Sequence, residues 1–119
     1  MMMDTLREEG VDEDGGTEES KGESLVTTEL VLEISGEDDT LCVSQLLLRG
    51  LELTAFEPDC AERLPNLQTL SLSHNKFATL ERFDRFGALT ELNLNFNQIC
   101  SLDGLEAPLL AKLYLSNNR

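Results

Sequence analysis

The sequence predicts an α/β fold in which one short unit is repeated and stacked into a solenoid. Two observations carry this prediction. The same spacing of leucines, closed by an asparagine, occurs three times, and the closing residues Asn75, Asn97 and Asn118 lie 22 and 21 residues apart. Within each unit the apolar residues first alternate and then return at wider spacing, which indicates a short strand followed by a turn or helical segment. Units this short bury their leucines only by stacking on neighbouring units.

The three clear copies share the pattern Leu-x-x-Leu-x-Leu-x-x-Asn and begin at Leu67, Leu89 and Leu110. A weaker fourth copy precedes them, with Leu51 where the asparagine would stand. Terminal repeats are commonly atypical. The sequence therefore predicts leucine-rich repeats over residues 43–119, about four in number and the last one incomplete. The chain is accordingly expected to be a fragment of a longer protein.

Each element of the repeat follows from its residues. The Leu-x-Leu core predicts a short strand, and successive strands are expected to lie parallel on the concave face. A closing asparagine can satisfy backbone groups where the chain turns inward, so Asn75, Asn97 and Asn118 are expected to form a structural ladder. The short repeat leaves room on the convex side for 3₁₀ or short helical returns only, with a true helical turn around residues 58–64 of the longer first unit.

The segment ahead of the repeats is strongly acidic. Residues 1–40 hold 14 acidic and 2 basic residues, whereas residues 41–119 hold 9 acidic and 7 basic residues. The first part has few apolar side chains to offset the entropy of ordering, which predicts a disordered acidic tail over residues 1–24.

Residues 25–42 are predicted to form an N-terminal capping segment, because an uncovered end of the stack would expose apolar side chains. Val26, Leu30 and Ile34 lie at i, i+4 and i+8, which gives the apolar stripe of a capping helix. Leu30, Leu32 and Ile34 also alternate as they would in a strand, so a strand is the alternative.

The repeats resemble the 22-residue leucine-rich-repeat class that is typified by the nuclear regulatory subunit of protein phosphatase 1. The run from Asn97 to Leu105 fits the pattern of that class closely, whereas Phe77, Phe83 and Phe86 are aromatic departures. The lead-in from Thr27 is similar to the start of several cilium-associated members. The resemblance implies little about function, because the class includes phosphatase regulators, an axonemal dynein light chain, tubulin-folding factors and cilium-associated proteins.

Catalytic and metal-binding chemistry are not expected. His74 is the only histidine and has no evident nucleophile or metal partner, and the three cysteines are widely spaced. An EF-hand-like spacing that starts at Asp12 has Thr17 where the loop requires glycine. We therefore predict no enzyme activity, no cofactor and no metal.

Charge and cysteine usage bear on partners and location. The net charge of −14 comes without clusters of Lys and Arg, so binding to nucleic acid or to anionic membranes is not expected. The odd number of cysteines and the absence of an apolar signal segment predict an intracellular protein with free thiols. The cytoplasm, cytoskeleton or cilium is expected, with the nucleus as an alternative, and the oligomeric state is not predicted.

The remaining function is protein binding by the concave face. Side chains between the leucines of each strand should point to this face, and a further column should lie at its rim. Phe96 and Tyr114 are the expected anchors, because exposed aromatic side chains bring large contact areas. The alternative is that Phe96 packs against the next turn and that Tyr114 covers a neighbouring strand. The candidate partner-binding residues are Leu47, Arg49, Ser71, Ser73, His74, Asn93, Asn95, Phe96, Tyr114 and Ser116.

Two functions follow. The first is a non-enzymatic protein–protein interaction module, acting as a scaffold or targeting subunit through the concave face, in a ciliary, cytoskeletal or phosphatase complex as the resemblance implies. The alternative is an acidic nuclear chaperone or histone-binding protein that works through its acidic tail. The salt dependence of partner binding distinguishes the two functions. Binding through the acidic tail should weaken as ionic strength rises, whereas binding through aromatic anchors should persist.

Overall fold

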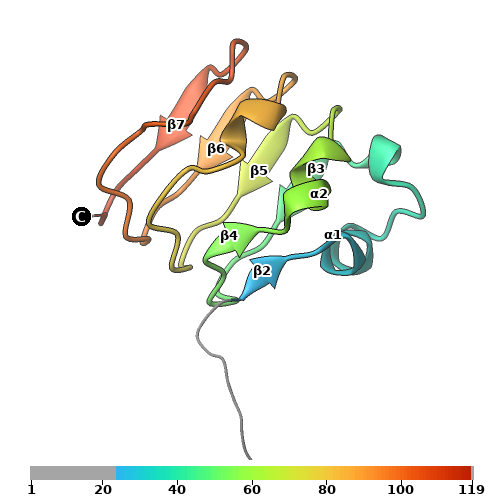
Figure 1. Cartoon of the computed structure of the whole chain (residues 1–119), viewed down its shortest axis with the longest axis horizontal. Coiled ribbons are helices and arrows are strands. Elements are labelled where there is room, and N and C mark those ends of the chain that lie inside the picture. Colours follow the sequence, from blue (N-terminus) through green and yellow to red (C-terminus); the bar gives the residue numbers. More distant parts are fainter. Residues whose placement is uncertain (1–23, 119) are drawn as a thin grey trace, which may run out of the picture.

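The computed structural model describes residues 24–118, in which the chain winds into successive coils with their strands side by side (Figure 1). The predicted acidic tail over residues 1–24 lies outside the described residues except for Ser24. Four strands form one parallel sheet in the order β3-β5-β6-β7. Their bounds are Gln45–Leu47, Thr69–Ser71, Glu91–Asn93 and Lys112–Tyr114. The prediction of parallel strands is confirmed.

The register places equivalent positions of the repeats beside one another. Leu46 pairs with Leu70, Leu70 with Leu92, and Leu92 with Leu113. Because side chains alternate along a strand, the residues on either side of each central leucine emerge on the opposite surface. We call that surface the open face. It corresponds to the predicted concave face.

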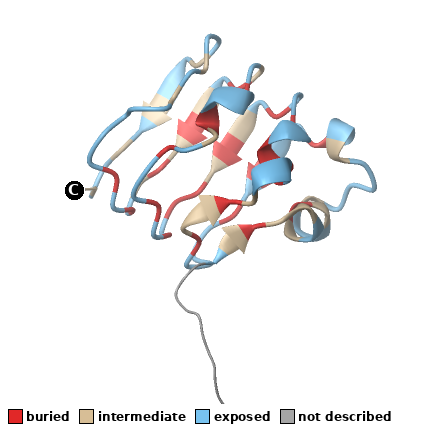
Figure 2. Ribbon diagram, in the orientation of Figure 1, coloured by how far each residue is buried: buried red, intermediate tan, exposed pale blue. Residues whose placement is uncertain are grey.

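The core lies between the sheet and the segments that lead from one strand to the next. The leucines of β5 and β6 are fully buried there, whereas β7 carries only half-buried and exposed residues (Figure 2). Phe77, Phe83 and Phe86 fill the core together with Phe56. Their ring centroids lie 5.4 to 6.0 Å apart in tilted or edge-on geometry, as aromatic pairs prefer. These departures from the repeat pattern are therefore core residues.

The returns between strands differ from one repeat to the next. The first contains β4, Ala55–Phe56, and a helix α2, Pro58–Glu62, with proline at the start of the helix as predicted. The second contains the 3₁₀ helix η3, Phe83–Arg85. In the third, residues 98–111, only turns are found. The convex returns are thus short, as the repeat length predicts.

The N-terminal segment contains a helix and not the alternative strand over Leu30–Ile34. Helix α1 spans Thr28–Ser35, begins where the Thr27 hydroxyl accepts a hydrogen bond from the Leu30 N–H at 3.1 Å, and ends at Gly36 with φ of 78°. It packs against β3 at one end of the sheet (Figure 1). A 3₁₀ helix η2, Thr40–Cys42, leads from it into β3.

Of the predicted apolar stripe of this helix, Leu30 packs against the core as expected, whereas Val26 and Ile34 do not have the expected places. Val31 is the fully buried side chain of α1, while Ile34 is 45% exposed. Val26 precedes the helix and belongs to β2, Leu25–Val26, which pairs in parallel with β4 on the return side. The segment is therefore joined to the first return by backbone hydrogen bonds as well as by apolar contacts.

Candidate functional site

The asparagine ladder builds the edge of the open face. In each repeat the side-chain amide bridges two coils, since its nitrogen donates to carbonyls of its own and the preceding coil while its oxygen accepts from the preceding coil. Asn75 donates to Leu48 O at 2.6 Å and accepts from Leu51 N and Leu53 N at 3.0 Å each. Asn97 and Asn118 repeat the arrangement one and two coils later. In the described coils, the asparagine side chains of the predicted ladder thus form hydrogen bonds with backbone groups of neighbouring coils.

The column just before the asparagines has a left-handed backbone. Gly50, His74, Phe96 and Asn117 have φ of 70°, 59°, 62° and 59°. Histidine and phenylalanine pay a steric cost there that glycine avoids. In the first three the N–H donates to the carbonyl of the following coil, for example from His74 to Asn95 at 2.9 Å. This turn aims the side chains of the column at the rim of the open face.

Three side chains from successive coils meet at that rim, and we call them the rim row: Arg49, His74 and Phe96. The Arg49 Nη2 lies 3.1 Å from the His74 Nε2. The rings of His74 and Phe96 are stacked, with centroids 4.3 Å apart and planes inclined by 11°. Phe96 remains 46% exposed beside this stack.

The open face is polar apart from a few apolar side chains. Leu47 on β3 is 54% exposed and Tyr114 on β7 is 40% exposed. Tyr114 therefore keeps a large free surface where it lies beside Asn93, its register partner on β6. Ser71 is half-buried between these two anchors, and Ser116 is exposed.

Three predicted site residues are buried or hydrogen-bonded within the fold. Ser73 is only 8% exposed, so its assignment as a partner-binding residue is wrong, because a side chain buried to this extent leaves a partner almost no surface. Asn93 Oδ1 accepts from Asn95 N at 2.9 Å, and Asn95 Oδ1 accepts from Ser116 N at 2.7 Å. Both asparagines are half-buried and have part of their polar capacity engaged within the sheet.

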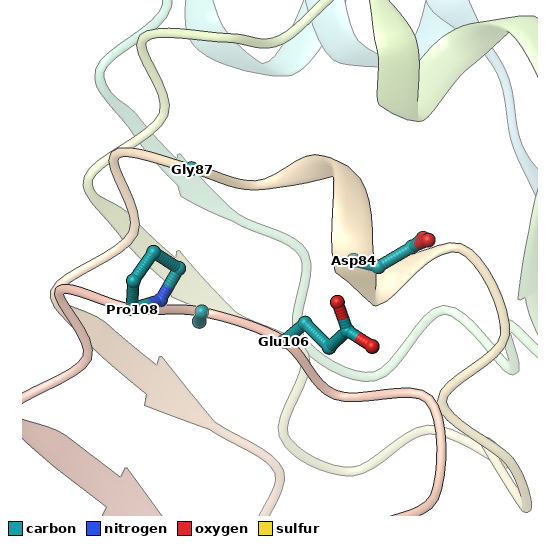
Figure 3. A pocket seen from close by; sticks show the side chains of 5 residues that line it. Asp84, Gly87, Glu106 and Pro108 are labelled. Carbon is teal, nitrogen blue, oxygen red and sulfur yellow. The ribbon is translucent and has the colours of Figure 1, made fainter.

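A depression of about 470 Å³ lies on the return side, between the second and third returns. It is lined by Asp84, Gly87, Glu106, Ala107 and Pro108, with both carboxylates at the end away from the proline (Figure 3). Asp84 lies 3.7 Å from the Arg85 guanidinium. No nucleophile or histidine lines the depression, and no cluster of three or more potential metal ligands occurs in residues 24–118. Nothing in this part of the chain points to catalysis.

The cysteines are free thiols in different surroundings. Cys42 and Cys100 are exposed, and Cys60 is buried in α2. Burial, helped by the negative charge of Glu57, raises the pKa of the Cys60 thiol to about 11. A raised pKa makes Cys60 a core residue of low reactivity.

Among the described residues, no helix has the length and apolarity that a membrane crossing requires.

Comparison with known proteins agrees with this architecture. A family model described as leucine rich repeat matches residues 43–99, which contain β3, β5 and β6 and the first two returns. No curated protein matches the chain. Domains of this kind generally act in protein–protein interaction. The match and the coils with their asparagine ladder together support a leucine-rich repeat protein.

Proposed function

We propose that the chain is a protein–protein interaction module that acts as a scaffold or targeting subunit through its open face. The observation that carries this proposal is the set of exposed apolar anchors on an otherwise polar sheet: Leu47, Phe96 and Tyr114. Such side chains at the centre of an interface commonly contribute about 2 kcal/mol or more each to binding.

The sheet beneath these anchors favours binding. The central leucines of β3, β5 and β6 are buried at 1% exposure or less, and each strand is bonded to its neighbours in register. A rigid platform loses little conformational entropy when a partner docks, so the contacts made by the anchors are not offset by ordering of the backbone. In this proposal α1 acts as the N-terminal cap of the solenoid.

The setting of the proposed scaffold rests on the resemblance to the 22-residue repeat class. It favours a ciliary, cytoskeletal or phosphatase complex inside the cell. The three free thiols at Cys42, Cys60 and Cys100 agree with a reducing compartment. The alternative, an acidic chaperone or histone binder, rests on residues 1–24, whereas the exposed anchors belong to the open face. We therefore keep the scaffold function.

A matched pair of variants tests the proposal. Leu47→Ala with Tyr114→Ala removes apolar surface from the open face, and Leu102→Ala with Leu109→Ala removes comparable exposed surface from the third return. Partners are captured from cell lysate at low and high salt and quantified by mass spectrometry, after circular dichroism has shown that each variant is folded. We expect the first pair to reduce capture of the main partner by about 10-fold or more, and the second pair to leave it unchanged.

Equal capture by both pairs would refute binding through the open face. Loss of the partner only when residues 1–24 are deleted, with the same loss at high salt, would replace the scaffold with the acidic-tail alternative.

A further inference from the structure

We infer that the rim row recognises a peptide segment of a partner protein in which a carboxylate side chain lies close to an apolar side chain. This inference rests on the proposed function of the open face and names the chemistry of its partner. It is carried by the hydrogen bond between Arg49 and His74, the stack of His74 on Phe96, and the charges around them.

The contact between Arg49 and His74 sets the donor and acceptor roles of the imidazole. A guanidinium has only N–H donors, so the His74 Nε2 is the acceptor of the hydrogen bond at 3.1 Å. The ring N–H of this tautomer is then on Nδ1. Within residues 24–118, the Arg49 and His74 side chains have no other hydrogen bond or ion pair. Both side chains are exposed.

The free polar groups of the Arg49 and His74 side chains are therefore hydrogen-bond donors only, and neither side chain offers a ligand an acceptor. Arg49 keeps its remaining guanidinium N–H groups, and His74 adds the N–H of Nδ1. A carboxylate has acceptors only and matches the planar guanidinium in a two-point contact. Phosphate recognition commonly uses clusters of arginines, and the rim row has one, so we assign the carboxylate of an Asp or Glu.

Phe96 supplies the apolar half of the site. Its ring is held by the stack on His74, and 46% of the residue remains exposed. A ring held in place in the free protein loses little rotamer freedom on binding. An apolar side chain of the partner can therefore cover Phe96 while the neighbouring carboxylate reaches Arg49.

The local charge favours an acidic segment although the whole chain carries a net charge of −14. The charged residues among the open-face columns are Arg49, Glu91 and Lys112, two bases and one acid. Glu52, the acid closest to Arg49 in sequence, lies 3.5 Å from Lys76 and is partly compensated by it. Charges beyond a screening length of about 8 Å at physiological ionic strength contribute little at the rim.

The test begins with selection of random peptides of about twelve residues by display on the full chain. The best peptide is synthesised with its acidic residue and with the matching amide. Dissociation constants are measured by fluorescence anisotropy for the parent chain and for Arg49→Gln, Phe96→Asn and the control Arg63→Gln, which removes an exposed guanidinium beside α2. Asparagine is chosen at position 96 because it tolerates positive φ and stands in the same column at position 117.

We expect the selected peptides to carry Asp or Glu within three residues of an apolar side chain. The change from acid to amide should weaken binding about 10-fold on the parent chain and less than about 2-fold on Arg49→Gln, because the two changes remove one contact. Phe96→Asn should also weaken binding about 10-fold, and Arg63→Gln should have no effect.

Selection of peptides without an acid, or an acid-to-amide change that costs as much on Arg49→Gln as on the parent chain, would overturn the inference. If such peptides still lose binding with Leu47→Ala and Tyr114→Ala, the proposed function stands and only the assigned chemistry fails. If no open-face change affects any selected peptide, both proposals fail. If no peptide is enriched, the inference fails and the capture experiment alone decides the proposed function. Binding that tightens about 10-fold when residues 1–23 are removed would identify the chain's own acidic segment as the occupant and overturn the assignment to a partner.

Discussion

At the scale of single residues, Asn97 shows how a buried polar side chain holds two coils together. Its amide donates to the carbonyls of Leu72, Leu94 and Asn95 and accepts from the N–H of Phe77, with 5% of the residue exposed. Buried backbone groups cost free energy when they lose their partners. The ladder therefore stabilises the turn after each strand mainly by preventing that loss.

Replacing Asn97 with leucine, which keeps a similar volume, should lower the free energy of unfolding by about 3 kcal/mol, because several buried backbone groups lose a partner. Asn118→Leu should cost clearly less, since Asn118 is only half-buried and water can reach the freed groups. Urea unfolding followed by circular dichroism measures both changes. Equal losses at the two positions would contradict the account.

Cys60 offers a second prediction at this scale, through the pH dependence of its thiol. Burial raises its pKa from 9.0 to about 11, so the folded state favours the neutral thiol. The resulting stabilisation is present below pH 9 and is lost as the pH rises through about 11. The folded chain should therefore lose stability in this window more steeply than a Cys60→Ala variant does, as measured by urea unfolding at each pH.

The same thiol should differ from the other two in reactivity. At pH 8 in the native state, Cys42 and Cys100 should react with a thiol reagent, and Cys60 should react only after denaturant is added. Mass spectrometry of the labelled chain identifies the sites. Rapid native labelling of Cys60 would show that α2 opens readily.

At the scale of elements, the returns are positioned by close backbone contacts. Gly104 has φ of 95°, and a Cβ at this position would lie 2.9 Å from the carbonyl oxygen of Leu80. The third return thus approaches the second more closely than any side chain would allow.

Gly104→Ala should destabilise the fold by about 1–3 kcal/mol, because it adds both a steric clash and left-handed strain. Gly87→Ala is the matched control, since nothing lies within 4 Å of its added Cβ and its backbone is not left-handed. Urea unfolding of both variants checks the difference. A loss at Gly87 as large as that at Gly104 would rule out the close approach as the cause.

The sequence predicted the type of most elements but not all their contacts. The Leu-x-Leu alternation predicted the four strands of the open face, and the spacing of apolar residues predicted a helix before them. The pairing of β2 with β4 was not predicted, because a two-residue strand has no periodicity of its own. Burial of Val31 and not Ile34 depends on how α1 is tilted on β3, which helical spacing does not determine.

At the scale of the whole molecule, the repeat period predicted which residues become neighbours. His74 and Phe96 occupy the same position in successive repeats, so their shared column could be read from the sequence. Two other features of the site could not be predicted from the sequence. The reach of Arg49 to His74 depends on the length and rotamer of a side chain one position earlier in its repeat. Ser73 is buried although Arg49 and Ser116, at the same position of their repeats, are exposed, so the repeat pattern does not determine burial there.

Because coils contact mainly their neighbours, stability should vary along the stack in the manner of a one-dimensional array. The central leucines of β5 and β6 are fully buried, while Leu113 in β7 is half-buried (Figure 2). The Leu72 N–H is bonded to Asn93 between the inner strands, and the Leu94 N–H is bonded to Tyr114 of β7. Opening of β7 alone frees the second amide and leaves the first protected.

Native-state hydrogen exchange followed by NMR should therefore give Leu72 a protection factor at least about 10-fold higher than that of Leu94. The Lys112 N–H of β7, which is bonded to the Thr90 carbonyl, should be no better protected than that of Leu94. A denaturant series separates opening of one coil from global unfolding, because a small opening exposes little surface and depends weakly on urea. Protection that is equal at all three amides, with the same urea dependence, would mean that the coils open in one cooperative step. In that case the contacts between neighbouring coils are strong enough to hold β7 as firmly as β5.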